Sequence, residues 1–139
     1  HPDPRGDEGI HRMTYALVLH EGGFSTETVI RPAWELNHPL LVGANLLAGS
    51  LLTVSAANVL VEAIKPAEDG RGFIVRLYEA ERSSCTAVVK FGLPVRSVRL
   101  CNLLEEDGVE LALLDNEVSL DFRAFGIISL RVIPADTRP

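Results

Sequence analysis

From residue 51 onward, the sequence is a succession of short β-prone runs separated by breaks that have turn chemistry. The runs lie at 51–55, 58–65, 72–81, 85–91, 95–104, 109–113, 118–122 and 125–133. The breaks contain Gly, Pro, Asp, Asn and Ser, the residues that tight turns favour, as in Glu68-Asp69-Gly70-Arg71-Gly72 and Gly92-Leu93-Pro94. Short strands at this spacing are typical of an antiparallel β-sandwich, which is the mainly β fold that we predict.

The first third of the chain has a different pattern. Residues 10–20 alternate in character, with one side formed by His11, Met13, Tyr15, Leu17 and Leu19. A period of two is the mark of a half-buried strand, so we predict a strand here.

One short helix is expected after this strand, near the N-terminus. Ser25-Thr26-Glu27 is a helix-start signal, and apolar residues follow at helical spacing, at Val29, Ile30, Ala33 and Trp34. Pro32 lies past the first turn, where its ring clashes with a preceding carbonyl and one hydrogen bond is lost. We therefore expect the helix to be kinked, broken or restarted at Pro32.

The length and the hydrophobic content of the chain fit one globular domain. The chain has 139 residues, of which 47% are hydrophobic, and we divide it into an extended lead-in at 1–9, a sandwich domain at 10–134 and a tail at 135–139. Its lead-in looks cut from a missing upstream region. No apolar run approaches the roughly 20 residues of a membrane span, so we expect a soluble protein without a membrane partner. A net charge of -6, with scattered basic residues, excludes nucleic acid as a partner.

Neither cysteines nor histidines form a metal-binding pattern. Cys85 and Cys101 fall in predicted strands without a second Cys or His at ligand spacing, so we expect two buried free thiols. Such thiols fit a reducing compartment, and we assign the cytoplasm. Histidines occur at positions 1, 11, 20 and 38, but His11 and His20 point to opposite faces of one strand. We predict no cofactor and no metal in this chain.

The acidic residues do not form a catalytic pair. Glu105-Glu106-Asp107 and Glu68-Asp69-Gly70 lie at predicted turns, where carboxylates are usually solvated or bonded to nearby backbone. The sequence also lacks a G-x-S-x-G nucleophile elbow, a phosphate-binding G-x-x-x-x-G-K and a G-x-G-x-x-G. We therefore predict no catalytic residue.

Arg76 is the most informative charged residue, because it shares a strand face with Ile74 and Tyr78. A hairpin centred near Asp69-Gly70 places Glu62 within about one residue of the position opposite Arg76, which predicts a cross-strand ion pair. The alternative is that Arg76 or Glu79 faces a domain interface or a ligand.

Several segments also match motifs of a known family in order. They are Asp7-Glu8-Gly9-Ile10-His11, Thr14-Tyr15-Ala16-Leu17 with His20, Ala33-Trp34-Glu35-Leu36-Asn37-His38-Pro39-Leu40, Lys65-Pro66-Ala67-Glu68-Asp69 with Ile74-Val75-Arg76-Leu77-Tyr78-Glu79, Asn102-Leu103-Leu104-Glu105 and Phe125-Gly126-Ile127-Ile128-Ser129-Leu130. Together they resemble the C-terminal β domain of the zinc-dependent α-mannosidase family of glycoside hydrolases. The chain departs from the family at Pro32, which interrupts the helix, and at Gly126, where the family usually has Glu.

The resemblance implies a fold, a partner and a division of roles. The fold is a sandwich of the galactose-mutarotase-like super-sandwich type. In the family, the zinc ion and both catalytic carboxylates of the retaining reaction belong to an N-terminal catalytic domain, which is absent here. This chain would be a scaffold for that domain of the same polypeptide, inactive alone and in contact with carbohydrate only through it. Candidate interface or cleft-edge residues are Asp7, His11, Arg76 and Glu79.

Two other functions stay open, an independent carbohydrate-binding module and a purely structural interaction module. Sugar binding usually needs exposed aromatic platforms, and only 6% of the chain is aromatic. Trp34 lies on the predicted helix, and the phenylalanines at core positions are Phe73, Phe91, Phe122 and Phe125.

Overall fold

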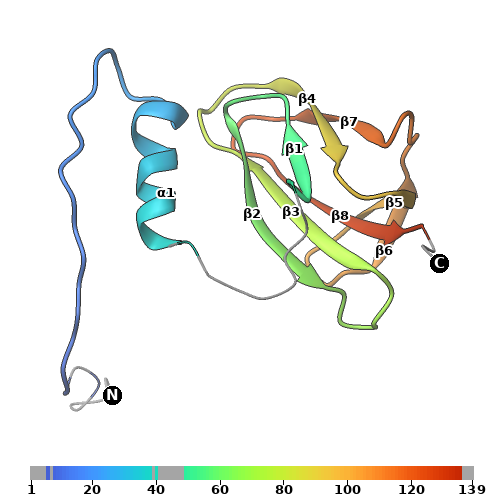
Figure 1. Cartoon of the computed structure of the whole chain (residues 1–139), viewed down its shortest axis with the longest axis horizontal. Coiled ribbons are helices and arrows are strands. Elements are labelled where there is room, and N and C mark those ends of the chain that lie inside the picture. Colours follow the sequence, from blue (N-terminus) through green and yellow to red (C-terminus); the bar gives the residue numbers. More distant parts are fainter. Residues whose placement is uncertain (1–5, 7, 39, 41–48, 136–139) are drawn as a thin grey trace.

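The computed structural model describes residues 6, 8–38, 40 and 49–135, and it is an antiparallel β-sandwich with a short helical segment near the N-terminus (Figure 1). The helical segment consists of η1 (Thr26–Ile30), a π-helical turn, and α1 (Arg31–Asn37). The strands are β1 (Leu52–Val54), β2 (Val59–Pro66), β3 (Phe73–Glu79), β4 (Cys85–Phe91), β5 (Val95–Cys101), β6 (Asp107–Glu110), β7 (Glu117–Phe122) and β8 (Ile127–Pro134). The predicted fold class is confirmed.

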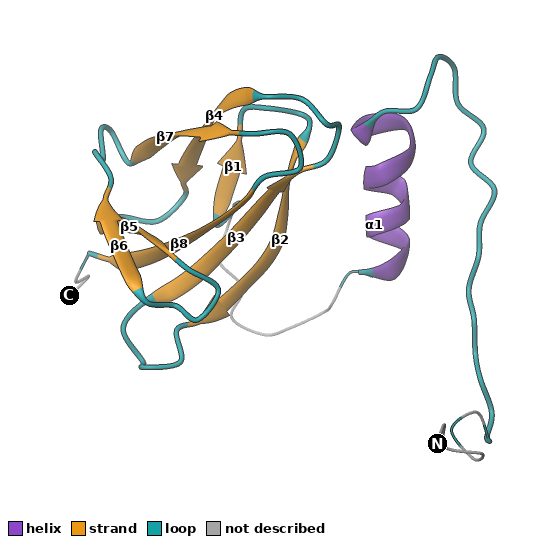
Figure 2. Cartoon of the chain, turned by 180° about the vertical axis from the view of Figure 1, so that it is seen from behind, coloured by secondary structure: helices purple, strands orange, loops and turns teal. Residues whose placement is uncertain are grey.

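The strands form two sheets that pack face to face (Figure 2). One sheet has the order β1-β4-β7 and the other the order β2-β3-β8-β5-β6, with antiparallel pairing throughout. Alternate side chains of each sheet fill the space between them, and Val75, Leu77, Val89, Leu130 and Val132 are completely buried. Burying one such side chain stabilises the fold by about 1.5–3 kcal/mol.

Turn residues determine where the strands end. Asp115 and Asn116 both have positive φ, at 49° and 65°, and a bridge joins Leu114 to Glu117 on either side of them. This two-residue connection is the tight turn that the sequence predicts, because Asp and Asn tolerate the left-handed conformation. Phe125 also has positive φ, at 54°, and its ring is 63% exposed in the turn before β8. The prediction that Phe125 lies in the core is therefore wrong, whereas Phe91 and Phe122 are buried there.

The helical segment is continuous through the proline, because Ile30 and Arg31 both have right-handed helical backbone angles, so the predicted break or restart is absent. Ser25 caps η1, since its Oγ accepts a hydrogen bond from the Thr28 amide at 3.1 Å. Pro32 lies in the first turn of α1, where the π-helical geometry of η1 changes to α-helical geometry.

Residues 10–20 do not form the half-buried strand that their alternation predicts. The chain is extended there, but it has no strand assignment and every side chain is exposed. The reason is positional, because α1 stands between this segment and the sandwich (Figure 1). The described part of the chain therefore offers it no sheet to join.

Both cysteines lie in strands and are free thiols, as predicted, although each is half-buried rather than buried. Burial raises the pKa of the Cys101 thiol above its ordinary value. Among the described residues, no helix has the length and apolar character needed to cross a membrane.

We predict a large difference between two alanine substitutions in the β2–β3 connection. Gly70 and Gly72 have similar positive φ, at 74° and 72°, but a Cβ at Gly72 would lie 2.1 Å from the carbonyl oxygen of Val132. Gly70→Ala, with open space around it, should lower the free energy of unfolding by about 1–2 kcal/mol. Gly72→Ala should lower it by more than about 3 kcal/mol, because backbone must move. Equal losses in urea denaturation would contradict the structure.

Candidate functional site

The face of the five-stranded sheet that points away from the core has the charged residues that the sequence singles out; we call it the outer face. Two rows of paired residues cross it. In one row, Arg131 on β8 pairs with Ile74 on β3 and with Arg99 on β5. In the other row, Ser129 on β8 pairs with Arg76 on β3 and with Cys101 on β5. Since paired residues project to the same side, the rows place three arginines on one face.

Two turns meet over Arg131 and cover its side chain, which is only 3% exposed. We call this part of the outer face the closed half, although a hollow of about 850 Å³, lined partly by Arg71, Arg96 and Arg99, lies beside the covered guanidinium. Its Nη1 lies 2.8 Å from Asp69 Oδ1 and its Nε lies 2.5 Å from Asp107 Oδ1. It also donates to the carbonyl oxygens of Glu105 and Arg71, at 2.6 Å and 3.0 Å. The prediction that these acidic turns are solvated or bond only locally is wrong, because the buried guanidinium holds both.

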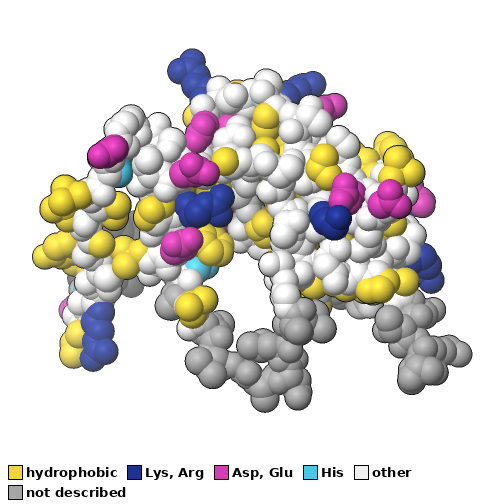
Figure 3. All heavy atoms as spheres, turned by 45° about the horizontal axis from the view of Figure 1, so that its top comes forward, with side chains coloured by type: hydrophobic (Ala, Val, Ile, Leu, Met, Phe, Trp, Pro, Cys, Tyr) yellow, Lys and Arg dark blue, Asp and Glu magenta, His cyan; other side chains and the backbone are white. Residues whose placement is uncertain are grey.

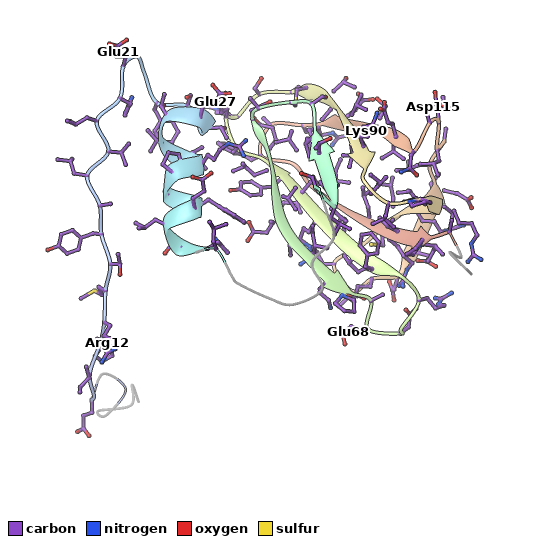
Figure 4. The ribbon with its side chains drawn as sticks, viewed as in Figure 1. Arg12, Glu21, Glu27, Glu68, Lys90 and Asp115 are labelled. Atoms are coloured by element: carbon purple, nitrogen blue, oxygen red, sulfur yellow. The ribbon has the colours of Figure 1, made fainter. Side chains whose placement is uncertain are left out.

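A second ion pair reinforces the closed half. Lys65 Nζ lies 2.6 Å from Glu105 Oε1, and the Glu105 carboxylate also accepts the Glu68 amide at 2.8 Å. These contacts hold the pKa of Glu105 below its ordinary value despite its burial. Hydrogen bonds from the amide and guanidinium of Arg71, with Arg131 beside them, hold the pKa of Asp69 well below its usual range. Figure 4 shows Glu68 at the tip of this turn.

Arg76 lies on the open half of the outer face, and its Nε donates to Ser129 Oγ at 3.1 Å. The predicted register is confirmed to within one residue, because Ala63 pairs with Arg76. The predicted ion pair with Glu62 is wrong: within the described residues, no carboxylate lies within 4.0 Å of the Arg76 guanidinium nitrogens. Glu62 lies at an irregularity in β2, between Val61 and Ala63, and so has no residue directly opposite it.

A hollow of about 400 Å³ lies on this open half, between the sheet and the start of the helical segment. Its lining is mostly apolar and consists of Ile30, Glu62, Arg76, Tyr78, Glu79, Ala80, Phe125 and Ile127. Burial first, and the negative charge of Glu62 second, raise the pKa of Tyr78. Phe125 and Ile127 are 63% and 60% exposed, so the hollow has an apolar rim.

Glu79 borders the same hollow, but its side chain is only 1% exposed. Its carboxylate accepts hydrogen bonds from Asn58 Nδ2 at 2.9 Å, from the Glu81 amide at 2.7 Å and from the Phe125 amide at 2.8 Å. Burial opposes ionisation, but these hydrogen bonds together outweigh it and lower the pKa of Glu79. The carboxylate therefore links the end of β3 to the turn that precedes β8.

The structure describes three of the four candidate residues, and two of these three lie beside one hollow. Arg76 and Glu79 border one hollow, whereas His11 lies in the exposed segment whose Arg12 is far from the sheet in Figure 4. Asp7 lies outside the described residues. Within the part of the chain that the structure describes, no three His, Cys, Asp or Glu side chains are grouped so as to hold a metal ion.

Sequence reasoning missed Arg131, although a signal was present. A single arginine interrupts the apolar run Ile127-Ile128-Ser129-Leu130-Arg131-Val132-Ile133. A cation within such a run needs buried acceptors, which the chain provides in turns far away in the sequence.

Removing Arg131 should cost more stability than removing its neighbour Arg99. Arg131→Ala leaves Asp69, Asp107 and two carbonyl groups without their shared donor, so we expect a loss of about 3 kcal/mol in the free energy of unfolding. Arg99 pairs with Glu110 at 2.7 Å near the surface, and Arg99→Ala should cost less than about 1 kcal/mol. Chemical denaturation of the two variants measures the difference, and similar losses would argue against a clamp at Arg131.

The lowered pKa of Glu79 predicts a pH dependence of stability. Because its folded-state pKa lies below the ordinary value of 4.5, ionised Glu79 stabilises the fold above that pH, and this contribution disappears as the pH falls through the folded-state pKa. Glu79→Gln should therefore weaken the fall in unfolding free energy on acidification below about pH 4.5. Thermal unfolding from pH 7 to pH 3 tests this, and parallel profiles for the two proteins would refute it.

Comparisons with known proteins agree with this architecture. The sequence profile of the glycosyl hydrolases family 38 C-terminal beta sandwich domain matches residues 58–130, just over half of the chain. Human alpha-mannosidase 2C1 is 37% identical over 142 residues, which cover 95% of this chain and 14% of the human protein. Mouse alpha-mannosidase 2C1 is 38% identical over 142 residues, which also cover 95% of this chain and 14% of the mouse protein.

A more distant relative shows the same relation. Alpha-mannosidase G of Dictyostelium discoideum is 29% identical over 116 residues, which cover 76% of this chain and 11% of that protein. The chain thus spans about one seventh of the length of the human and mouse relatives. The profile match includes β2 to β7, the first half of β8 and both acidic turns. It also includes every residue that lines the hollow beside Arg76 except Ile30. The chain belongs to the family of glycosyl hydrolase family 38 C-terminal β-sandwich domains.

Proposed function

We propose that this chain is an accessory domain of an α-mannosidase, a scaffold for the catalytic domain rather than the place of bond cleavage. The parent polypeptide hydrolyses α-mannosyl linkages with retention and uses zinc, which its catalytic domain binds. The observation that supports this best is the profile match over residues 58–130, in a chain that spans 14% of the length of the human relative. Most of the length of such a protein lies outside the matched region.

The use of the carboxylates supports a scaffold role. Retaining glycosidases need two carboxylates that face the scissile bond from opposite sides, about 5–5.5 Å apart. Here Asp69 and Asp107 bind Arg131, Glu105 binds Lys65, and Glu79 accepts three hydrogen bonds from its own chain. These acids hold turns in place.

The partner in this proposal is the N-terminal catalytic domain of the same polypeptide, and carbohydrate is reached only through it. The open half of the outer face suits such a contact, because Arg76 has donors beyond the one that Ser129 accepts, beside an exposed apolar rim. We assign Arg76, Glu79, His11 and Asp7 to the interface or the edge of the cleft. The two free thiols support a cytoplasmic location.

The isolated chain should therefore be folded but inactive. We expect no turnover of an aryl α-mannoside by the purified chain, with or without added zinc, and turnover by the full-length polypeptide that a chelator abolishes. Circular dichroism verifies that the isolated chain is folded. Zinc-dependent turnover by the isolated chain would overturn the proposal, and saturable mannoside binding by it would identify a carbohydrate-binding module instead.

A further inference from the structure

The exposed segment at residues 10–20 has a row of large apolar side chains that nothing in the described chain covers. Met13, Tyr15, Leu17 and Leu19 are 86%, 93%, 89% and 90% exposed. Removing large apolar side chains from water is favourable, so an aligned row of four marks a surface built for contact. Hydrophobic side chains accordingly crowd the left edge of the molecule in Figure 3, where this segment lies.

The two faces of the segment have different surroundings. Ala16, Val18 and His20 line a hollow together with residues of the helical segment, among them Pro32 and Leu36. The odd-numbered residues alternate with these in an extended chain, so they point away from the helical segment. The sandwich cannot cover the apolar side chains at the odd-numbered positions, because α1 lies between the sandwich and this segment (Figure 1).

The backbone of the segment is equally available. No backbone hydrogen bond links residues 12–19 to the rest of the described chain. An extended segment with unpaired N–H and C=O groups can add to the edge of a sheet, and side chains at alternate positions then fill apolar pockets. The period of two matches the pleat of a strand and not the 3.6-residue period of a helix.

We propose that residues 10–20 form a β-strand that completes a sheet in the part of the polypeptide preceding this domain, with Met13, Tyr15, Leu17 and Leu19 buried in that sheet's apolar layer. The inference rests on the proposed function only in taking the domain to be part of a longer polypeptide. Two observations favour a sheet of the preceding part of the polypeptide as the partner of this segment. The chain spans 14% of the length of the human relative, and the matching family is described as a C-terminal domain, which by its description follows other parts of the polypeptide.

Amide hydrogen exchange tests the proposal without any measurement of turnover. We expect the amides of residues 12–19 to exchange nearly unprotected in the 139-residue chain. In the full-length polypeptide they should be protected by on the order of 100-fold or more, as in a paired strand. Equal exchange in the two proteins would overturn the proposal, even if the isolated chain proved to be inactive as proposed above.

Matched substitutions test the apolar row. The double variant Tyr15→Asp with Leu17→Asp should leave the melting temperature of the isolated chain unchanged and lower that of the full-length polypeptide by several degrees. Leu104→Asp is the control, because Leu104 is also 80% exposed but lies in another loop, and it should change neither protein. An unchanged full-length protein would refute the buried row. A dimeric isolated chain with residues 12–19 protected would identify a second copy as the occupant.

Discussion

The buried guanidinium of Arg131 determines how the outer face of this sandwich is divided. It projects from β8 and binds carboxylates from two turns, at Asp69 and Asp107, together with two carbonyl oxygens. A guanidinium stays charged at any ordinary pH, so its burial requires this full set of acceptors. The turns between β2 and β3 and before β6 are thereby held over one half of the sheet, while the half around Arg76 stays open.

The sequence was sufficient for the parts of the fold that depend on local patterns. Alternation and turn chemistry predicted every strand of the sandwich to within a few residues, and the helix-start signal at Ser25 marked the cap of η1. The contacts that cross the sheet were not predictable in this way. Counting residues across the hairpin places Glu62 about opposite Arg76, but an irregularity in β2 makes Ala63 the partner of Arg76 instead. No local sequence signal predicts such an irregularity.

The candidate site shows the same limit. Arg76 and Glu79 lie on one strand, as the sequence predicts, but their environments differ. Arg76 is half-buried and bonded to Ser129, whereas Glu79 is buried among amide donors. These environments depend on β8 and on the turn at Phe125, which are about 50 residues away in sequence. Arg131 was missed for a related reason, because its acceptors come from two distant turns that seemed solvated when each was considered alone.

The failure at residues 10–20 is of another kind, since the pattern there is sound and the surroundings are incomplete. A strand is stable only when its backbone pairs and its apolar face is covered, and the described chain supplies neither to residues 12–19. The sandwich, by contrast, fills its core with its own side chains, and its buried charged groups at Glu79, Glu105 and Arg131 all have partners within the domain. A domain with a filled core and an extended, uncovered segment beside it is suited to joining another part of the polypeptide. If both proposals hold, residues 10–20 would make one contact through backbone pairing, and the open half around Arg76 would make a second one through side chains.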